Sequence, residues 1–193
     1  MTQREAAYPV LPMFLDRWSP RAFARKPIGE ETLKTVVEAA RWAPSSMNYQ
    51  PWRFVYALNG DAHWEAFLAA LVPGNQLWAA NASALIFVVS DTILEAYGKR
   101  GPSHSHSFDS GAAWMAMALQ AHSMGLITHG MTGVDFDAAA KAVNLPEDFR
   151  VEAAIALGYQ GDATDLPEPL RAREVPSDRR PISKTLFAGA FPG

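Results

Sequence analysis

A helix with almost no polar face is predicted over residues 109–124, and the need to cover it constrains the whole fold. Asp109 suits the N-cap position and Gly125 suits the C′ position, so both ends of the helix are marked. A helix that is apolar on every side must be covered on every side, either inside a core or at a subunit interface. Its many alanines favour close helix–helix approach, so we expect a dimer interface with one side on its own sheet. A buried helix in a monomer is the alternative.

Size and composition limit the class of protein. The 193 residues are enough for a single domain with a sizeable core, and 19% charged against 49% hydrophobic residues excludes a disordered chain. A formal charge of −3 gives no general attraction to nucleic acid or anionic lipid. The absence of cysteine excludes disulfides, thiolate catalysis and sulfur-ligated metals. No segment reads as a signal peptide or membrane span, so we expect a cytoplasmic protein.

Three segments with clear periodicity outline the core. Apolar residues at helical spacing from Leu33 to Ala40 predict an amphipathic helix that ends before Pro44. Alternating residues over 52–58 predict a strand, and the continuous apolar run over 84–89 predicts a strand covered on both faces. Shorter apolar runs at 126–128 and 152–157 predict further strands, and Asp135 is expected to cap a short helix.

A polar loop joins the first predicted helix to the first of these strands. Its hydroxyl and amide side chains are held between two core elements, and they are Pro44, Ser45, Ser46, Asn48 and Gln50. A loop pinned in this way can present fixed donors and acceptors to a flat polar ring. An ordinary turn is an equally good interpretation of the loop alone, because Pro, Ser and Asn favour turns.

Two basic clusters are candidates for binding an anion. Arg17, Ser19 and Arg21 place two guanidiniums and a hydroxyl in one short bend, which suits a phosphate group. A solvated surface pair with Ser19 as an N-cap is the alternative. The second cluster, Arg179 and Arg180, follows a Pro-rich and charged segment that reads as an extended arm.

Several other polar residues are weaker candidates. Asn75 lies just before the central strand, where it offers an amide to a ligand or forms a plain polar turn. A lone histidine beside a strand, such as His129, is more often structural, whereas Gly133 allows backbone to approach a ligand closely. His104 and His106 fall in a segment over 97–108 that reads as a surface loop, and they lack a third ligand, so we assign no metal.

Taken in order, these motifs resemble the FMN-dependent nitroreductase family over nearly the whole chain. The most specific segment is Pro44-Ser45-Ser46-x-Asn48-x-Gln50-Pro51-Trp52. The supporting motifs are Arg17-x-Ser19-x-Arg21, Asp109-x-Gly111, Ala156-Leu157-Gly158-Tyr159 and Arg179-Arg180-Pro181.

The resemblance implies an α+β fold, with a nitroreductase-like central mixed sheet flanked by helices. It also implies one domain over 1–193, a homodimer built on the apolar helix, FMN at the subunit interface, and a C-terminal arm, approximately 160–193, that wraps the partner. Carried over by position, the cofactor-binding residues would be Arg17, Trp18, Ser19, Arg21, Pro44, Ser45, Ser46, Asn48, Gln50, Asn75, Thr132, Gly133 and Arg179.

The activity implied by the resemblance needs no catalytic side chain, because the flavin N5 carries the hydride. NADH or NADPH would reduce the flavin, and an oxidised small molecule such as a nitroaromatic or quinone would then reoxidise it in a ping-pong cycle. Other flavin reactions on the same fold remain open, namely dehalogenation, flavin fragmentation and ring dehydrogenation, as does non-catalytic FMN binding. A hydrolase using Ser45 or Ser46 lacks a nucleophile elbow and an orienting acid.

Overall fold

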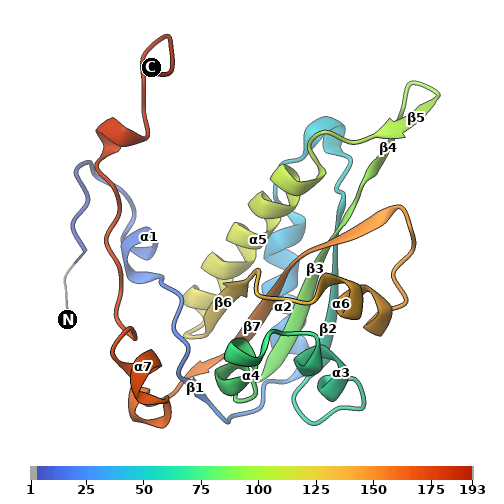
Figure 1. Ribbon diagram of the computed structural model, residues 1–193. Helices are drawn as coiled ribbons and strands as arrows, with labels where there is room; N and C mark the ends of the chain where they lie inside the picture. Colours follow the sequence, from blue (N-terminus) through green and yellow to red (C-terminus); the bar gives the residue numbers. More distant parts are fainter. Residues whose placement is uncertain (1–3, 193) are drawn as a thin grey trace.

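The computed structural model of the protein describes residues 4–192, and these form one sheet, a separate hairpin and two helical layers (Figure 1). The strands are β1 (Phe23–Ala24), β2 (Trp52–Leu58), β3 (Ala84–Asp91), β4 (Ile93–Ala96), β5 (Lys99–Pro102), β6 (Ile127–Met131) and β7 (Phe149–Gln160). The α-helices are α1 (Pro12–Asp16), α2 (Glu30–Arg41), α3 (Trp64–Ala69), α4 (Pro73–Ala79), α5 (His106–Ser123), α6 (Phe136–Ala142) and α7 (Glu168–Arg171). Short 3₁₀ helices lie at Ser46–Asn48, Ala163–Asp165 and Ile182–Lys184.

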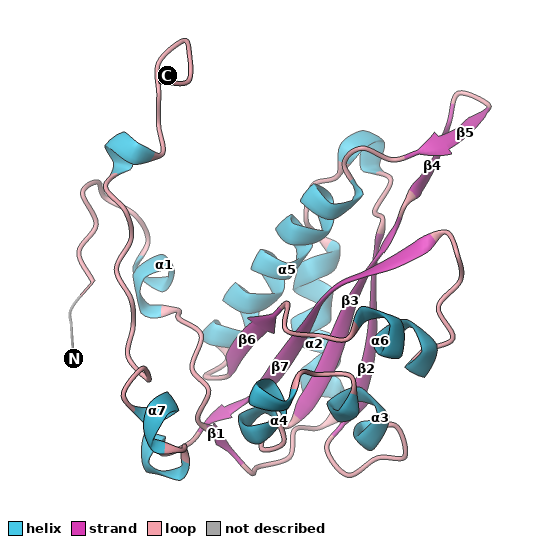
Figure 2. Cartoon of the chain, in the orientation of Figure 1, coloured by secondary structure: helices cyan, strands magenta, loops and turns pink. Residues whose placement is uncertain are grey.

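The central sheet has the strand order β1-β7-β3-β2, with β6 also paired to β7 (Figure 2). Within residues 4–192 every strand pairing is antiparallel, so the prediction of a mixed sheet is wrong for the described chain. The physical reason lies in the position of β7. Strands β3 and β6 run in the same direction, but both pair with β7, which keeps them from pairing with each other.

Strand β3 forms the centre of the core. It is buried from Ala84 to Ser90, which confirms the prediction of a strand covered on both faces. Ile86 and Val88 face the layer made by α2 and α5, whereas Leu85 and Phe87 face the layer made by α3, α4 and α6. The α+β fold with a central sheet between helices is therefore as expected.

Helix α5 begins earlier than the sequence predicts. Its N-cap is Ser105, and Asp109 is a buried residue inside the first turns, so the prediction of Asp109 as the N-cap is wrong. The Asp109 carboxylate instead accepts hydrogen bonds from the Ser46 backbone N–H at 3.1 Å and from the Ser105 hydroxyl at 2.9 Å. At the other end, Gly125 has a φ of +72°, as expected for a C′ glycine.

The side of α5 that faces away from the sheet carries apolar residues. Ala113, Met117 and Ala121 are buried against the chain's own core. On the outer side Phe108 is 81% exposed and Met115 is 37% exposed, and they lie about two helical turns apart on the same face. The chain therefore covers only part of a helix that has almost no polar face.

The segment over 97–108, predicted as a surface loop, contains a strand and the start of a helix. Residues Lys99–Pro102 form β5, which pairs with β4 in a hairpin that projects from the sheet (Figure 1). The turn places Tyr97 and Gly98 at φ +53° and +71°, which suits a two-residue hairpin turn. The prediction failed because β5 is polar and exposed, so the hairpin depends on backbone pairing that leaves no hydrophobic period in the sequence.

The two terminal segments of the described chain run alongside each other over residues 4–10 and 177–182, away from the sheet (Figure 1). The N-terminal segment that leads into α1 runs next to the chain that follows α7. Both carry exposed apolar side chains, among them Leu11, Leu186 and Phe191. Across residues 4–192 every helix is too short or too polar to span a bilayer.

Candidate functional site

A cavity of about 530 Å³ lies where three segments distant in the sequence meet. Its wall is rich in guanidiniums, and the residues that define it are Arg4, Arg17, Trp18, Ser19, Arg21, His129, Arg173, Ser177 and Arg179. The structure thus brings together the predicted residues of the first basic cluster and Arg179. Arg180 instead lines a neighbouring cavity beside the N-terminal segment, which shares Arg4, Ser177 and Arg179 with the first.

The positive charge at this cavity is poorly compensated. Burial lowers the pKa of the Arg17 guanidinium, and the neighbouring charges of Arg4 and Arg179 lower that pKa further. Burial also lowers the pKa of Arg4, with a further decrease from Arg179 and a partial offset from Asp178. Among residues 4–192, no carboxylate lies within ion-pair distance of these three arginines. Such a cluster is suited to binding an anion.

The C-terminal segment is fixed to the first basic cluster by a buried carboxylate. Glu174, with a side chain 2% exposed, lies 3.9 Å from the Arg21 guanidinium. Its Oε1 accepts the backbone N–H of Arg21 at 2.6 Å and that of Ala22 at 2.8 Å. This contact positions the chain that carries Arg173 and Arg179 against the cavity.

His129 supports the same bend from the β6 side. Its Nδ1–H donates to the Pro20 carbonyl at 2.9 Å, and its ring lies 4.6 Å from the Trp78 ring, centroid to centroid. Burial lowers the pKa of His129, which favours the neutral ring with its proton on Nδ1. His129 thus has a hydrogen-bond partner, as expected of a structural residue, and its side chain also lines the arginine cavity.

A second group of predicted residues lies at the adjoining end of β6. Asn75 donates from Nδ2 to the Gly133 carbonyl at 3.0 Å, and Thr132 is the exposed residue between β6 and Gly133. A Cβ at Gly133 would lie 2.6 Å from Asn75 Nδ2 and 2.9 Å from Val72 Cγ2. A side chain at 133 would displace the Asn75 amide and Val72, so glycine permits their close approach to this loop.

The polar loop between α2 and β2 forms a third group, and its backbone is strained. Met47, Asn48 and Gln50 have φ values of +53°, +53° and +55°. Such conformations cost about 1–3 kcal/mol each and persist only where the surroundings enforce them. Here the Ser45 hydroxyl accepts the Gln50 N–H at 2.9 Å, and the Asp109 carboxylate accepts the Ser46 N–H. The loop is pinned, as predicted from its position between core elements.

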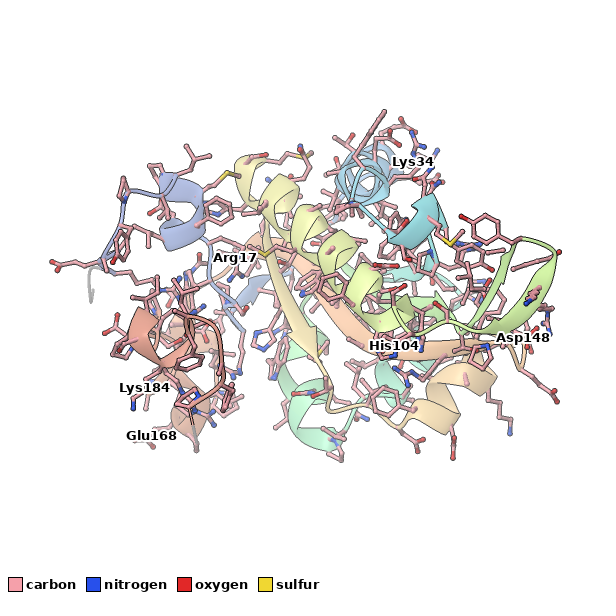
Figure 3. The ribbon with its side chains drawn as sticks, turned by 90° about the horizontal axis from the view of Figure 1, so that it is seen from above. Arg17, Lys34, His104, Asp148, Glu168 and Lys184 are labelled. Atoms are coloured by element: carbon pink, nitrogen blue, oxygen red, sulfur yellow. The ribbon has the colours of Figure 1, made fainter. Side chains whose placement is uncertain are left out.

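One chain does not bring this loop to the arginine cavity. Ser46 is bound to Asp109 near the start of α5, whereas Arg17 and Trp18 lie beside His122 near its end. The rise of an α-helix over that interval is about 20 Å. Figure 3 shows the labelled Arg17 and His104 toward opposite ends of the same helix. The predicted loop residues are therefore separated from the arginine cavity within a subunit, and they are Pro44, Ser45, Ser46, Asn48 and Gln50.

Sequence reasoning missed three residues of this region. Arg4 lies in a short segment without periodicity, Glu174 lies in an arm that reads as solvated, and Asp109 reads as a helix cap. Their partners are distant in the sequence, at Arg17, Arg21 and Ser46. Only the folded chain reveals these contacts.

Comparison with known proteins identifies the family. The model described as "Nitroreductase family" matches residues 15–159. The structure is similar to a crystal structure of an oxidoreductase containing FMN, with 48% identity, a TM-score of 0.95, and coverage of 98% of this chain and 96% of that chain.

Two curated proteins are also similar. One is an NADH dehydrogenase of Thermus thermophilus, 26% identical over 95% of this chain and 98% of that protein. The other is an uncharacterized 15.4 kDa protein of Mycolicibacterium smegmatis, 34% identical over 72% of this chain and 97% of that protein. The chain belongs to the nitroreductase family, in agreement with the resemblance found in its motifs.

We predict that Asp109→Ala loosens the strained loop. The substitution leaves the Ser46 N–H without its acceptor, which costs about 1–3 kcal/mol of unfolding free energy, and amide exchange at residues 46–50 should accelerate. Asp137→Ala, at an exposed position in α6, is the matched control and should change stability by no more than about 0.5 kcal/mol. Unchanged exchange at Ser46 in Asp109→Ala would show that another contact holds the loop.

We also predict a pH dependence of stability from His129. Because its folded-state pKa is lowered, the unfolded chain binds the proton more readily below its own pKa of about 6.5. The contribution of His129 to the unfolding free energy is therefore complete above that pH and is lost as the pH falls toward the folded-state pKa. Denaturant titrations between about pH 7 and 5 should show a steeper loss in wild type than in His129→Gln. The exposed His63→Gln control should keep the wild-type slope, and equal slopes in all three proteins would refute the assignment.

Proposed function

We propose that this protein is an FMN-dependent oxidoreductase that transfers hydride from NADH or NADPH to a small oxidised acceptor such as a nitroaromatic or quinone. The observation that carries the proposal is the cluster of Arg17, Arg21 and Arg179 on one cavity of a nitroreductase-family chain. The 48% identity to an oxidoreductase containing FMN supports the choice of cofactor. The similarity to an NADH dehydrogenase supports a nicotinamide donor.

The residues at the cavity fit a flavin mononucleotide. A phosphate dianion would compensate the guanidiniums of Arg17 and Arg179, which line the same cavity without a carboxylate partner among residues 4–192. Ser19 adds a hydroxyl on the same wall. The flavin ring would extend toward Asn75 and the loop of Thr132 and Gly133, where Thr132 is exposed and the Asn75 amide is held against the Gly133 carbonyl.

The proposal requires a homodimer. The strained loop and the arginine cavity lie about 20 Å apart along α5, so they can contact one cofactor only if they come from different subunits. Two copies of α5 packed antiparallel across a two-fold axis would bring the Asp109 end of one helix to the His122 end of the other. This packing would also cover Phe108 and Met115. In the same dimer the part of the arm that follows Arg179 would lie on the partner, because the chain from Glu174 to Arg179 is held at its own cavity.

The reaction needs little acid–base chemistry from the chain itself. When bound, FMN would supply hydride acceptance from the nicotinamide and hydride donation to the acceptor. The chain would bind the phosphate with guanidiniums, orient the ring with the pinned loop, and exclude water between the subunits. Ser45 offers no support for a hydrolase, because its hydroxyl accepts the Gln50 N–H and makes no hydrogen bond to a histidine among residues 4–192.

We predict that the purified protein shows a flavin absorption band that NADH or NADPH bleaches and that a quinone or nitroaromatic restores. Arg17→Ala combined with Arg21→Ala should weaken FMN binding by about 100-fold or more, since two charge-assisted contacts are lost, with the circular dichroism spectrum retained. Arg25→Ala removes an arginine bound to Asn81 outside the cavity and should leave FMN affinity unchanged. A protein that cannot be reconstituted with FMN, or a double variant that keeps it, would contradict the proposal.

A further inference from the structure

Arg4 lies outside every motif found in the sequence, yet its guanidinium reaches the arginine cavity. It belongs to the segment that precedes α1 and lies thirteen residues before Arg17. Its Nη1 donates to the Leu15 carbonyl at 2.9 Å and to the Arg17 carbonyl at 2.8 Å. Both carbonyls lie at the end of α1, so Arg4 holds the chain from which the Arg17 side chain extends.

These two bonds leave part of the Arg4 guanidinium without an acceptor. Its Nε is buried and has no hydrogen-bond partner within residues 4–192, and the same is true of Nε of Arg17. A guanidinium has more donors than two carbonyls can satisfy, and a tetrahedral phosphate accepts several of them at once. Arg4 and Arg17 therefore both have an N–H group that lacks an acceptor within the described residues, and an anion would supply further acceptors to both guanidiniums.

Capping of α1 alone does not account for an arginine at this position. A positive charge near the C-terminus of a helix is stabilising, and the Arg4 guanidinium lies at the C-terminus of α1. However, α1 has only five residues, and the same contact places a third positive charge close to Arg17 and Arg179. The repulsion is offset when an anion lies between the three groups.

We propose that Arg4 is a direct ligand of the phosphate monoester of the bound cofactor and that it also positions Arg17. The inference rests on the proposed function, since it takes the phosphate to be that of FMN. The 2′-phosphate of NADPH has the same chemistry and is the other possible source. The FMN phosphate is the better match, because the cavity also contains Ser19. In addition, His129 of the cavity wall lies in β6, and this strand ends directly before Thr132 and Gly133.

The test compares FMN with riboflavin, which lacks the phosphate. In Arg4→Met the apolar stem is kept and the guanidinium is lost, so the Kd for FMN should rise about tenfold or more, while the Kd for riboflavin should stay within about twofold. Arg4→Lys keeps the charge but lacks the planar five-donor fork that can bind the carbonyls and a phosphate in a bidentate manner, so its FMN affinity should fall between those of wild type and Arg4→Met. Arg25→Met is the matched control and should bind both flavins as wild type does.

Four results would overturn the inference. Equal losses of FMN and riboflavin affinity in both Arg4 variants would show that Arg4 acts only on the fold. An unchanged FMN Kd with a higher KM for NADPH, but not for NADH, would assign the phosphate to the nicotinamide cofactor. An unchanged FMN Kd in Arg4→Met, with FMN bound normally by wild type, would remove the role of Arg4 alone, whereas a wild-type protein that binds no FMN would remove the proposed function as well.

Discussion

Helix α5 must be covered on all sides, and one chain covers only the sides that face its own sheet and helix α2. Ala113 and Met117 pack on that sheet, whereas Phe108 and Met115 remain open on the outer face. The same helix separates the strained loop from the arginine cavity, because the loop is bound to its first turns through Asp109. A second copy packed on the outer face would satisfy both constraints, since it covers the apolar row and brings a loop to each cavity.

The positive charge of the arginines determines which ligands the cavity can bind. Guanidiniums from the N-terminal segment, the bend after α1 and the C-terminal arm converge there, and Glu174 is the buried carboxylate that fixes the arm to that bend. Like charges brought together during folding destabilise the free protein. An anionic ligand bound between them would therefore stabilise the folded state. Loss of the cofactor is then expected to weaken the attachment of the two terminal segments.

Local patterns in the sequence predicted much of the fold, whereas contacts between distant residues were not predictable from it. Helix α2, strands β2 and β3 and the Asp135 cap of α6 follow from periodicity and capping, because those signals lie within a few residues of each other. The β4–β5 hairpin lacks an apolar period, and the antiparallel sheet depends on which strands flank β7. The roles of Arg4 and Asp109 depend on partners at the far ends of other elements. The assignment of individual residues to the flavin stays a prediction.

Subunit complementation tests most directly whether each site is shared between two chains. One subunit would carry Arg17→Ala with Arg21→Ala, and the other would carry Asn48→Pro, which is incompatible with the φ of +53° at that position. Each homodimer should be inactive, whereas a purified heterodimer contains one intact site and should recover about half of the wild-type activity. A folded heterodimer with no activity would show that each site lies within one chain, which would contradict the account.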